Sequence, residues 1–139
     1  ALQDIDPSHG DVYAANYEQF VTRIDHLDAQ LRSIFADTQG LRFMVFHPSW
    51  GYFAHTYGLE QVSIEWEGKA PKPGQLKELI ERARKDGINV IFAQPQFSTK
   101  SAAVIAKEIG GQVAFADPLA EDWLSNMQLV AAKFKAALK

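Results

Sequence analysis

From residue 42 onward, short apolar runs alternate with segments whose apolar residues recur at helical spacing. The short runs have the length of buried strands and lie at 42–46, 61–64, 88–93 and 112–116. The helical segments lie at 50–57, 73–86, 98–109 and 121–138. Strands that alternate with helices are typical of a parallel sheet covered on both faces. We therefore expect an α/β fold with a four-stranded, mostly parallel sheet and helices on both faces.

One long helix is expected to precede this sheet. Over Pro7–Ala36, apolar residues recur at alternating steps of four and three, which keeps them on one face. Asp6 before a proline is a typical helix start, and Gly40 is a typical end. A helix of thirty residues spans about 45 Å, more than a small domain needs. We therefore divide the chain into a connecting helix, 1–40, and an α/β lobe, 41–139.

Composition excludes several classes of function. The net charge is −3 and no lysine–arginine cluster is present, so nucleic acid is not an expected partner. There is no cysteine, which rules out disulfides, thiolate metal sites and cysteine nucleophiles. No apolar run approaches the ~20 residues that cross a bilayer. No signal peptide is recognisable, so an exported protein would be seen here as a mature form or a fragment.

Ligands of open α/β sheets bind beyond the carboxyl ends of the strands. His47 follows the first predicted strand, residues 94–96 follow the third, and Asp117 follows the fourth. Imidazole nitrogen and carboxylate oxygen suit zinc, and also manganese or iron. Because a tight site needs about four ligands, a metal site here requires ligands from outside the chain. The alternative is that Asp117 forms a turn with the following proline and that His47 caps a loop.

Other chemical signals are weaker. The remaining histidines, His9, His26 and His55, are expected to be solvated or to serve packing. Ser98 is expected to cap the helix that follows it, because no G-x-S-x-G elbow surrounds it. The glycine pair 110–111 follows a helix rather than a strand, which is the wrong context for a dinucleotide loop. Core packing is the expected role of the aromatic residues Trp50, Tyr52, Phe53 and Tyr57.

Three segments together resemble one known family. They are HPSWGYF at 47–53, FAQPQFS at 92–98 and ADPL at 116–119. In this order, and with the long helix before them, they resemble the cluster A-I solute-binding proteins of ABC importers, the zinc and manganese type. The resemblance extends over essentially the whole chain.

The resemblance implies a two-lobed protein whose lobes are joined by one rigid helix. In many members three histidines and a carboxylate hold the metal between the lobes. His47 matches the histidine of the second lobe and Asp117 matches its carboxylate. The other histidines would come from an N-terminal lobe absent from this sequence. Without that lobe, apolar surface on the long helix would be exposed, and the chain could self-associate.

The implied function is capture of zinc, with manganese or iron as alternatives, and delivery to the membrane permease of an ABC importer. Such a protein is not an enzyme. It works in the periplasm, or anchored at the cell surface in bacteria without an outer membrane.

Three alternative hypotheses about the function are compatible with the sequence. A small α/β enzyme could use His47 as general base with Asp117 orienting it, but neither a phosphate loop nor a nucleophile elbow is present. A siderophore- or cobalamin-type binding protein would place aromatic residues and arginines at the cleft, where we expect only Arg42. The third is a regulatory or interaction module. Metal titration separates the metal-binding function from all three.

Overall fold

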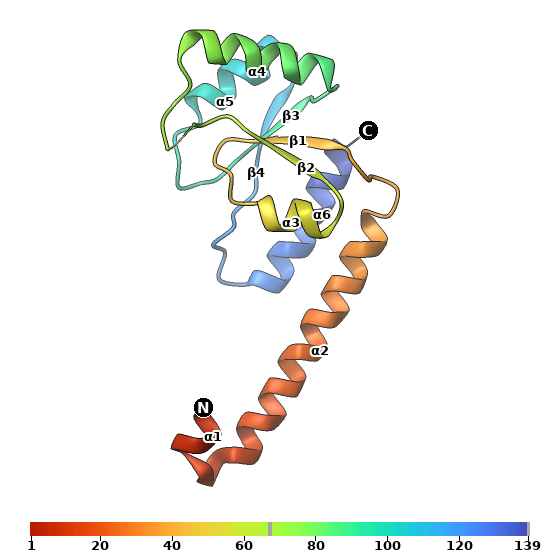
Figure 1. The fold of residues 1–139 in the computed structure, drawn as a ribbon, viewed down its shortest axis with the longest axis vertical. Helices are drawn as coiled ribbons and strands as arrows, with labels where there is room; N and C mark the ends of the chain where they lie inside the picture. Colours follow the sequence, from red (N-terminus) through yellow and green to blue (C-terminus); the bar gives the residue numbers. More distant parts are fainter. Residues whose placement is uncertain (67, 139) are drawn as a thin grey trace.

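Helices and strands alternate along the chain as the sequence predicts (Figure 1). The computed structural model describes residues 1–66 and 68–138. Its elements are helix α1 (Leu2–Ile5), the 3-10 turn η1 (Pro7–His9), helix α2 (Gly10–Ile34), strand β1 (Arg42–Val45), helix α3 (Gly51–Thr56), strand β2 (Glu60–Ser63), helix α4 (Pro73–Lys85), strand β3 (Val90–Ala93), helix α5 (Lys100–Glu108), strand β4 (Gln112–Phe115) and helix α6 (Trp123–Ala137). None of the helices in the described part is long and apolar enough to cross a membrane.

The four strands form one sheet in the order β2-β1-β3-β4. All three strand pairs are parallel, so the predicted α/β class is confirmed, and the described sheet is wholly rather than mostly parallel. Parallel strands point their carboxyl ends to the same edge of the sheet. The loops that follow the four strands therefore meet at one edge, where ligands of such sheets bind.

Each face of the sheet buries its own apolar core. Successive side chains of a strand point to opposite faces, and in β1 Phe43 and Val45 enter one core while Met44 enters the other. Helices α3, α6 and the last turns of α2 cover the first face, and α4 with α5 covers the second (Figure 1). Near the centre of the first core, the fully buried Phe134 packs against Phe43 and Phe92 with ring centroids 4.5 and 4.4 Å apart.

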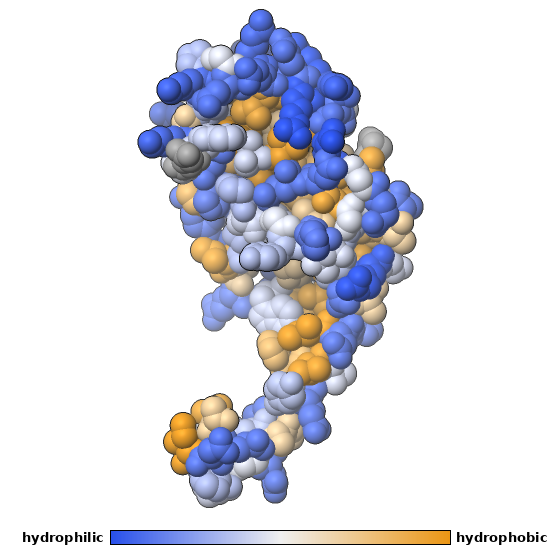
Figure 2. Space-filling view, in the orientation of Figure 1, coloured by the Kyte–Doolittle hydropathy of each residue, from blue (hydrophilic) through white to orange (hydrophobic). Residues whose placement is uncertain are grey.

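Helix α2 packs on the lobe through its C-terminal turns and through the ring of Phe20, which meets Trp123 of α6 edge-on at 5.7 Å between centroids. Leu27 and Leu31 are buried, whereas Tyr17, Phe20 and Ile24 are 68%, 48% and 40% exposed. The N-terminal part of the helix projects away from the sheet (Figure 1). Figure 2 shows apolar surface along this projecting part and at the N-terminal end of the chain. The predicted apolar stripe therefore exists, and only part of it is covered.

The ends of the long helix differ from the prediction. A 3-10 turn, Pro7–His9, precedes α2. The Asp6 carboxylate does not cap a backbone N–H, since it accepts hydrogen bonds from the Ser8 and Tyr13 hydroxyls and lies 2.8 Å from His9 Nδ1. At the other end α2 stops at Ile34 rather than Ala36.

Two other local predictions were wrong, and one was right in part. Thr99, not Ser98, is at the N-cap position of α5, but the Ser98 hydroxyl accepts from the backbone N–H of Lys100, the first residue of that helix, at 3.5 Å. Tyr52 lies on the outer side of the short helix α3 and is 94% exposed, unlike its buried neighbours Trp50 and Phe53. Arg42 begins β1 and therefore lies at the edge of the sheet opposite to His47, where it pairs with Glu60 and Asp86 at 2.5 and 3.2 Å.

Candidate metal site

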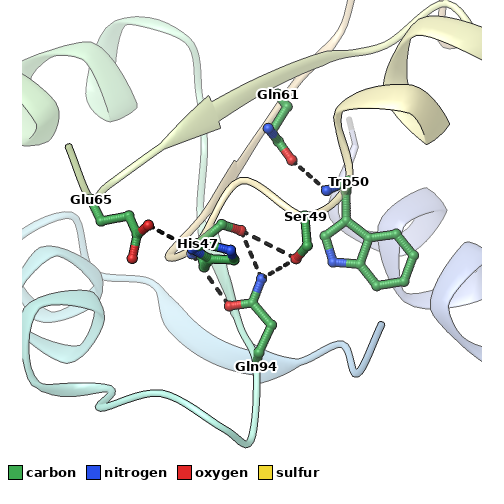
Figure 3. Close-up of polar contacts among 6 residues, drawn as sticks. All are labelled: His47, Ser49, Trp50, Gln61, Glu65 and Gln94. Carbon is green, nitrogen blue, oxygen red and sulfur yellow. Dashed lines mark hydrogen bonds and ion pairs between the residues drawn. The ribbon is translucent and has the colours of Figure 1, made fainter. Parts of the chain in front are cut away.

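His47 lies at the carboxyl edge of the sheet, two residues after the end of β1, and the side chain of Gln94 fixes its backbone. The amide oxygen of Gln94 accepts from the His47 N–H at 3.3 Å, and its nitrogen donates to the His47 carbonyl at 2.7 Å and to the Ser49 hydroxyl at 2.7 Å (Figure 3). Gln94 is 1% exposed. The position of His47 is thus set by the neighbouring strand β3, which Gln94 follows directly.

The imidazole of His47 is held by two further residues. Its Nδ1 lies 2.6 Å from a carboxylate oxygen of Glu65 (Figure 3), and the side chain of Glu65 is only 6% exposed. The ring of Phe97 stacks on the imidazole with centroids 4.6 Å apart and planes inclined by 21°. The His47 side chain itself is 38% exposed. Since Nδ1 is occupied, Nε2 is the nitrogen left to bind a ligand.

Asp117 follows β4 at the same edge of the sheet. One of its carboxylate oxygens, Oδ1, accepts from the side-chain amide of Gln96 at 2.8 Å and from the backbone N–H of Leu119 at 2.9 Å. The Asp117 carbonyl accepts from Asn126 at 2.7 Å, which ties the turn to α6. Both hydrogen bonds to the carboxylate involve Oδ1, so Oδ2 is the oxygen left for a ligand.

The two predicted ligands share an edge of the sheet but do not touch each other. His47 follows β1 and Asp117 follows β4, with β3 between these strands. Within residues 1–66 and 68–138, no group of three or more His, Cys, Asp or Glu residues could hold a metal ion. The described part of the chain therefore offers one imidazole nitrogen and one carboxylate oxygen, which suit zinc in their chemistry but do not complete a site.

The other three histidines lie on helices or turns, where they contact nearby residues or solvent. His9 lies 2.8 Å from the Asp6 carboxylate, and His26 lies 3.0 Å from the amide nitrogen of Gln30 on the same helix. His55 is exposed on α3. All three are exposed, which confirms the expectation that they are solvated or serve packing.

Glu65 and Phe97 lie near His47, although neither is among the ligand residues predicted from the sequence. Glu65 lies two residues after β2, so the rule that selects His47 and Asp117 applies to it as well. The pattern at 61–64 is the weakest of the four strand patterns, and nothing local shows that β2 pairs with β1. Phe97 belongs to a recognised motif, but its contact with His47 joins loops that are fifty residues apart.

The chain matches the model of the family described as the periplasmic zinc-uptake complex component A, ZnuA, over residues 1–137. It belongs to this family. A high-affinity zinc uptake system protein ZnuA of Paracoccus denitrificans is 36% identical over 116 residues, which cover 81% of this chain and 36% of that protein. The family resemblance seen in the sequence is confirmed.

Solved structures of the family share the fold. A crystal structure of ZnuA superposes with a TM-score of 0.96 at 43% identity and covers 99% of this chain and 52% of its own. A ZnuA deletion mutant with zinc bound gives a TM-score of 0.92 at 43% identity, covering 99% of this chain and 53% of its own. The chain thus spans about half, or less, of the length of these relatives.

Proposed function

We propose that this chain contributes half of a zinc-capture site to a longer solute-binding protein of an ABC importer. The observation that supports it best is the arrangement of His47. The carboxylate of Glu65 occupies its Nδ1 at 2.6 Å, and the partly exposed ring directs Nε2 away from that carboxylate at the edge of the sheet. A carboxylate on one nitrogen and a metal on the other is the usual arrangement of a zinc-binding histidine. Asp117 is proposed as the second ligand.

The remaining ligands are proposed to come from a second lobe. A closed zinc site has about four ligands, and relatives with about twice the length of this chain have room for a further lobe. In this proposal residues 1–40 join the lobes and 41–139 form the C-terminal one. The N-terminal lobe supplies further histidines and covers apolar residues of α2 that are now exposed, among them Phe20 and Ile24.

Zinc is the proposed cargo, which the intact protein would pass to the membrane permease of the importer. We propose that the intact protein works outside the cytoplasm, in the periplasm or at the cell surface. The names of the Paracoccus relative and of the zinc-bound ZnuA structure support zinc. A histidine and a carboxylate also accept manganese or iron, so the comparison of these metals belongs in the test.

Calorimetric titration of the longer protein with zinc tests this function. Manganese and iron are titrated for comparison, and we expect zinc to bind most tightly. Zinc binding should be weakened strongly by His47→Ala and by Asp117→Ala. His55→Ala is the matched control, because His55 is also an exposed histidine of the same lobe but lies on α3. The chain alone should bind far more weakly than the longer protein. Equal affinity of the wild-type and His47→Ala proteins would refute the assignment of His47.

The proposal also predicts that the chain alone self-associates through α2. Sedimentation velocity of the chain should show concentration-dependent association. The double variant Phe20→Ser, Ile24→Ser should reduce it, since both residues are exposed and apolar. A strictly monomeric wild-type chain at all concentrations would contradict this part of the proposal.

A further inference from the structure

Three residues outside the proposed ligand set restrain three separate degrees of freedom of His47. They come from different parts of the fold: Glu65 follows β2, Gln94 follows β3 directly, and Phe97 lies in the loop before α5. Figure 3 shows the first two reaching His47 from different directions. We propose that Glu65 is the positioning residue of the site, which fixes the proton on Nδ1 of His47 and so presents the Nε2 lone pair to zinc. This inference rests on the proposed function.

The chemistry of the His47–Glu65 pair determines which partner donates the hydrogen bond. An ionised carboxylate only accepts hydrogen bonds, so in the His47–Glu65 pair the proton lies on Nδ1. The 2.6 Å separation is short, as in charge-assisted hydrogen bonds. Because the Glu65 side chain is 6% exposed, water competes poorly for its oxygen. A neutral imidazole carries one proton, and once that proton is on Nδ1 the Nε2 atom has a free lone pair.

Gln94 and Phe97 restrain the backbone and the ring plane. The amide of Gln94 bonds both the N–H and the carbonyl of His47, and it is itself 1% exposed. Phe97 stacks on the imidazole at 4.6 Å, which resists rotation of the ring about its bond to Cβ. Neither residue distinguishes the two ring nitrogens. Of the three residues, Glu65 is the one that contacts a ring nitrogen, so we assign to Glu65 the role of selecting the Nδ1–H tautomer.

Glu65 is assigned a positioning role rather than a place among the ligands. The two nitrogens of an imidazole direct their bonds to different sides of the ring. A metal on Nε2 therefore lies on the far side from the carboxylate that holds Nδ1. Carboxylates that bind the second nitrogen of a ligating histidine orient the ring and raise its basicity, and their loss typically lowers metal affinity about 10–100-fold.

The first experiment reads the tautomer directly, in the metal-free chain. Imidazole ¹⁵N chemical shifts, recorded at a pH where the rings are neutral, distinguish Nδ1–H from Nε2–H. The chain has four histidines, and the signals of His47 are assigned by their loss in His47→Ala. We expect the Nδ1–H form in the wild type and a shift toward Nε2–H in Glu65→Ala. A wild-type ring that is mainly Nε2–H, or a tautomer unchanged by Glu65→Ala, would overturn the proposal.

The second experiment measures zinc affinity of the longer protein. Glu65→Ala should lose about 10–100-fold in affinity, and Glu65→Gln, which keeps the size of the side chain, should also lose affinity if Glu65→Ala fails to fold. Glu60→Ala is the matched control, because Glu60 lies at the opposite end of β2 and pairs with Arg42. Binding that depends on His47 but not on Glu65 overturns the positioning role and leaves the proposed function standing. Wild-type protein that binds no zinc overturns the proposed function, and the tautomer result then stands by itself.

Discussion

The side-chain amide of Gln96 donates a hydrogen bond to the carboxylate of Asp117 at 2.8 Å, which joins the loops that follow β3 and β4. Both residues lie at the edge of the sheet where the sequence places candidate ligands. The same carboxylate oxygen also accepts from the backbone N–H of Leu119 at 2.9 Å. Two donors on one oxygen hold the carboxylate in a fixed orientation, with its other oxygen free for a metal.

The variant Gln96→Ala should therefore weaken zinc binding of the longer protein only modestly. One of the two hydrogen bonds to Asp117 remains, and a single hydrogen bond contributes about 1 kcal/mol, or about fivefold in affinity. Competition with a zinc chelator of known affinity measures the difference. A loss as large as that of Asp117→Ala would mean that Gln96 does more than orient the carboxylate.

The glycine pair at 110–111 has two separate structural roles. Gly110 has a φ of +68°, and a Cβ built on it would meet nothing within 4 Å. A Cβ on Gly111 would lie 2.2 Å from the backbone carbonyl oxygen of Asn89. That oxygen accepts a hydrogen bond from the Gln112 N–H at 3.0 Å. The second glycine thus allows the entry of β4 to approach the entry of β3.

Alanine at these two positions should have different effects on stability. Gly111→Ala forces a backbone clash and should cost about 1–3 kcal/mol, while Gly110→Ala only places alanine in the left-handed region, at about 1 kcal/mol. Urea denaturation of both variants measures the difference. Equal stability of Gly111→Ala and the wild type would show that the two strands do not approach so closely.

The phenol of Tyr57 should make the protein less stable at alkaline pH. Burial, together with the hydrogen bond to Asp28 at 3.0 Å, raises the pKa of Tyr57 to about 12. An unfolded tyrosine has a pKa of about 10, so the folded state favours the neutral phenol. This stabilisation is complete below about pH 10 and is lost as the pH rises through about 12.

Urea midpoints between pH 9 and pH 12 measure this effect. The variant Tyr57→Phe should be less stable than the wild type at neutral pH, because it loses the hydrogen bond to Asp28, and its stability should fall less steeply above pH 10. Tyr52→Phe is the control, since Tyr52 is 94% exposed. An equally steep fall in Tyr57→Phe would assign the alkaline loss to other groups.

The secondary structure of the lobe follows from local patterns in the sequence. Strands β1, β3 and β4 have clear apolar runs and β2 has a weaker one, and β1 is buried on both faces because Phe43 and Met44 belong to different cores. The glycines that follow α3 and α4 are equally local signals, since Gly58 and Gly87 have φ values of +70° and +67°. Such signals depend on the residue and its neighbours alone, which is why the α/β class was predicted correctly.

The site depends on contacts that no local pattern encodes. Glu65 reaches His47 only because β2 is the neighbour of β1 in the sheet, and strand order is decided by packing of the whole fold. The error on Arg42 has a simpler cause, since the first and the last residue of a strand lie at opposite edges. The Ser98 hydroxyl does accept from the Lys100 N–H, but α5 begins only at Lys100, so Ser98 lies one residue before the N-cap position.

A crystal structure of the zinc-loaded longer protein, measured at the zinc absorption edge, would locate the metal directly. We expect one strong anomalous peak about 2.0–2.2 Å from both Nε2 of His47 and a carboxylate oxygen of Asp117, with Glu65 still bound to Nδ1. A peak bound to other residues, or one that persists unchanged in the His47→Ala protein, would contradict the proposed site.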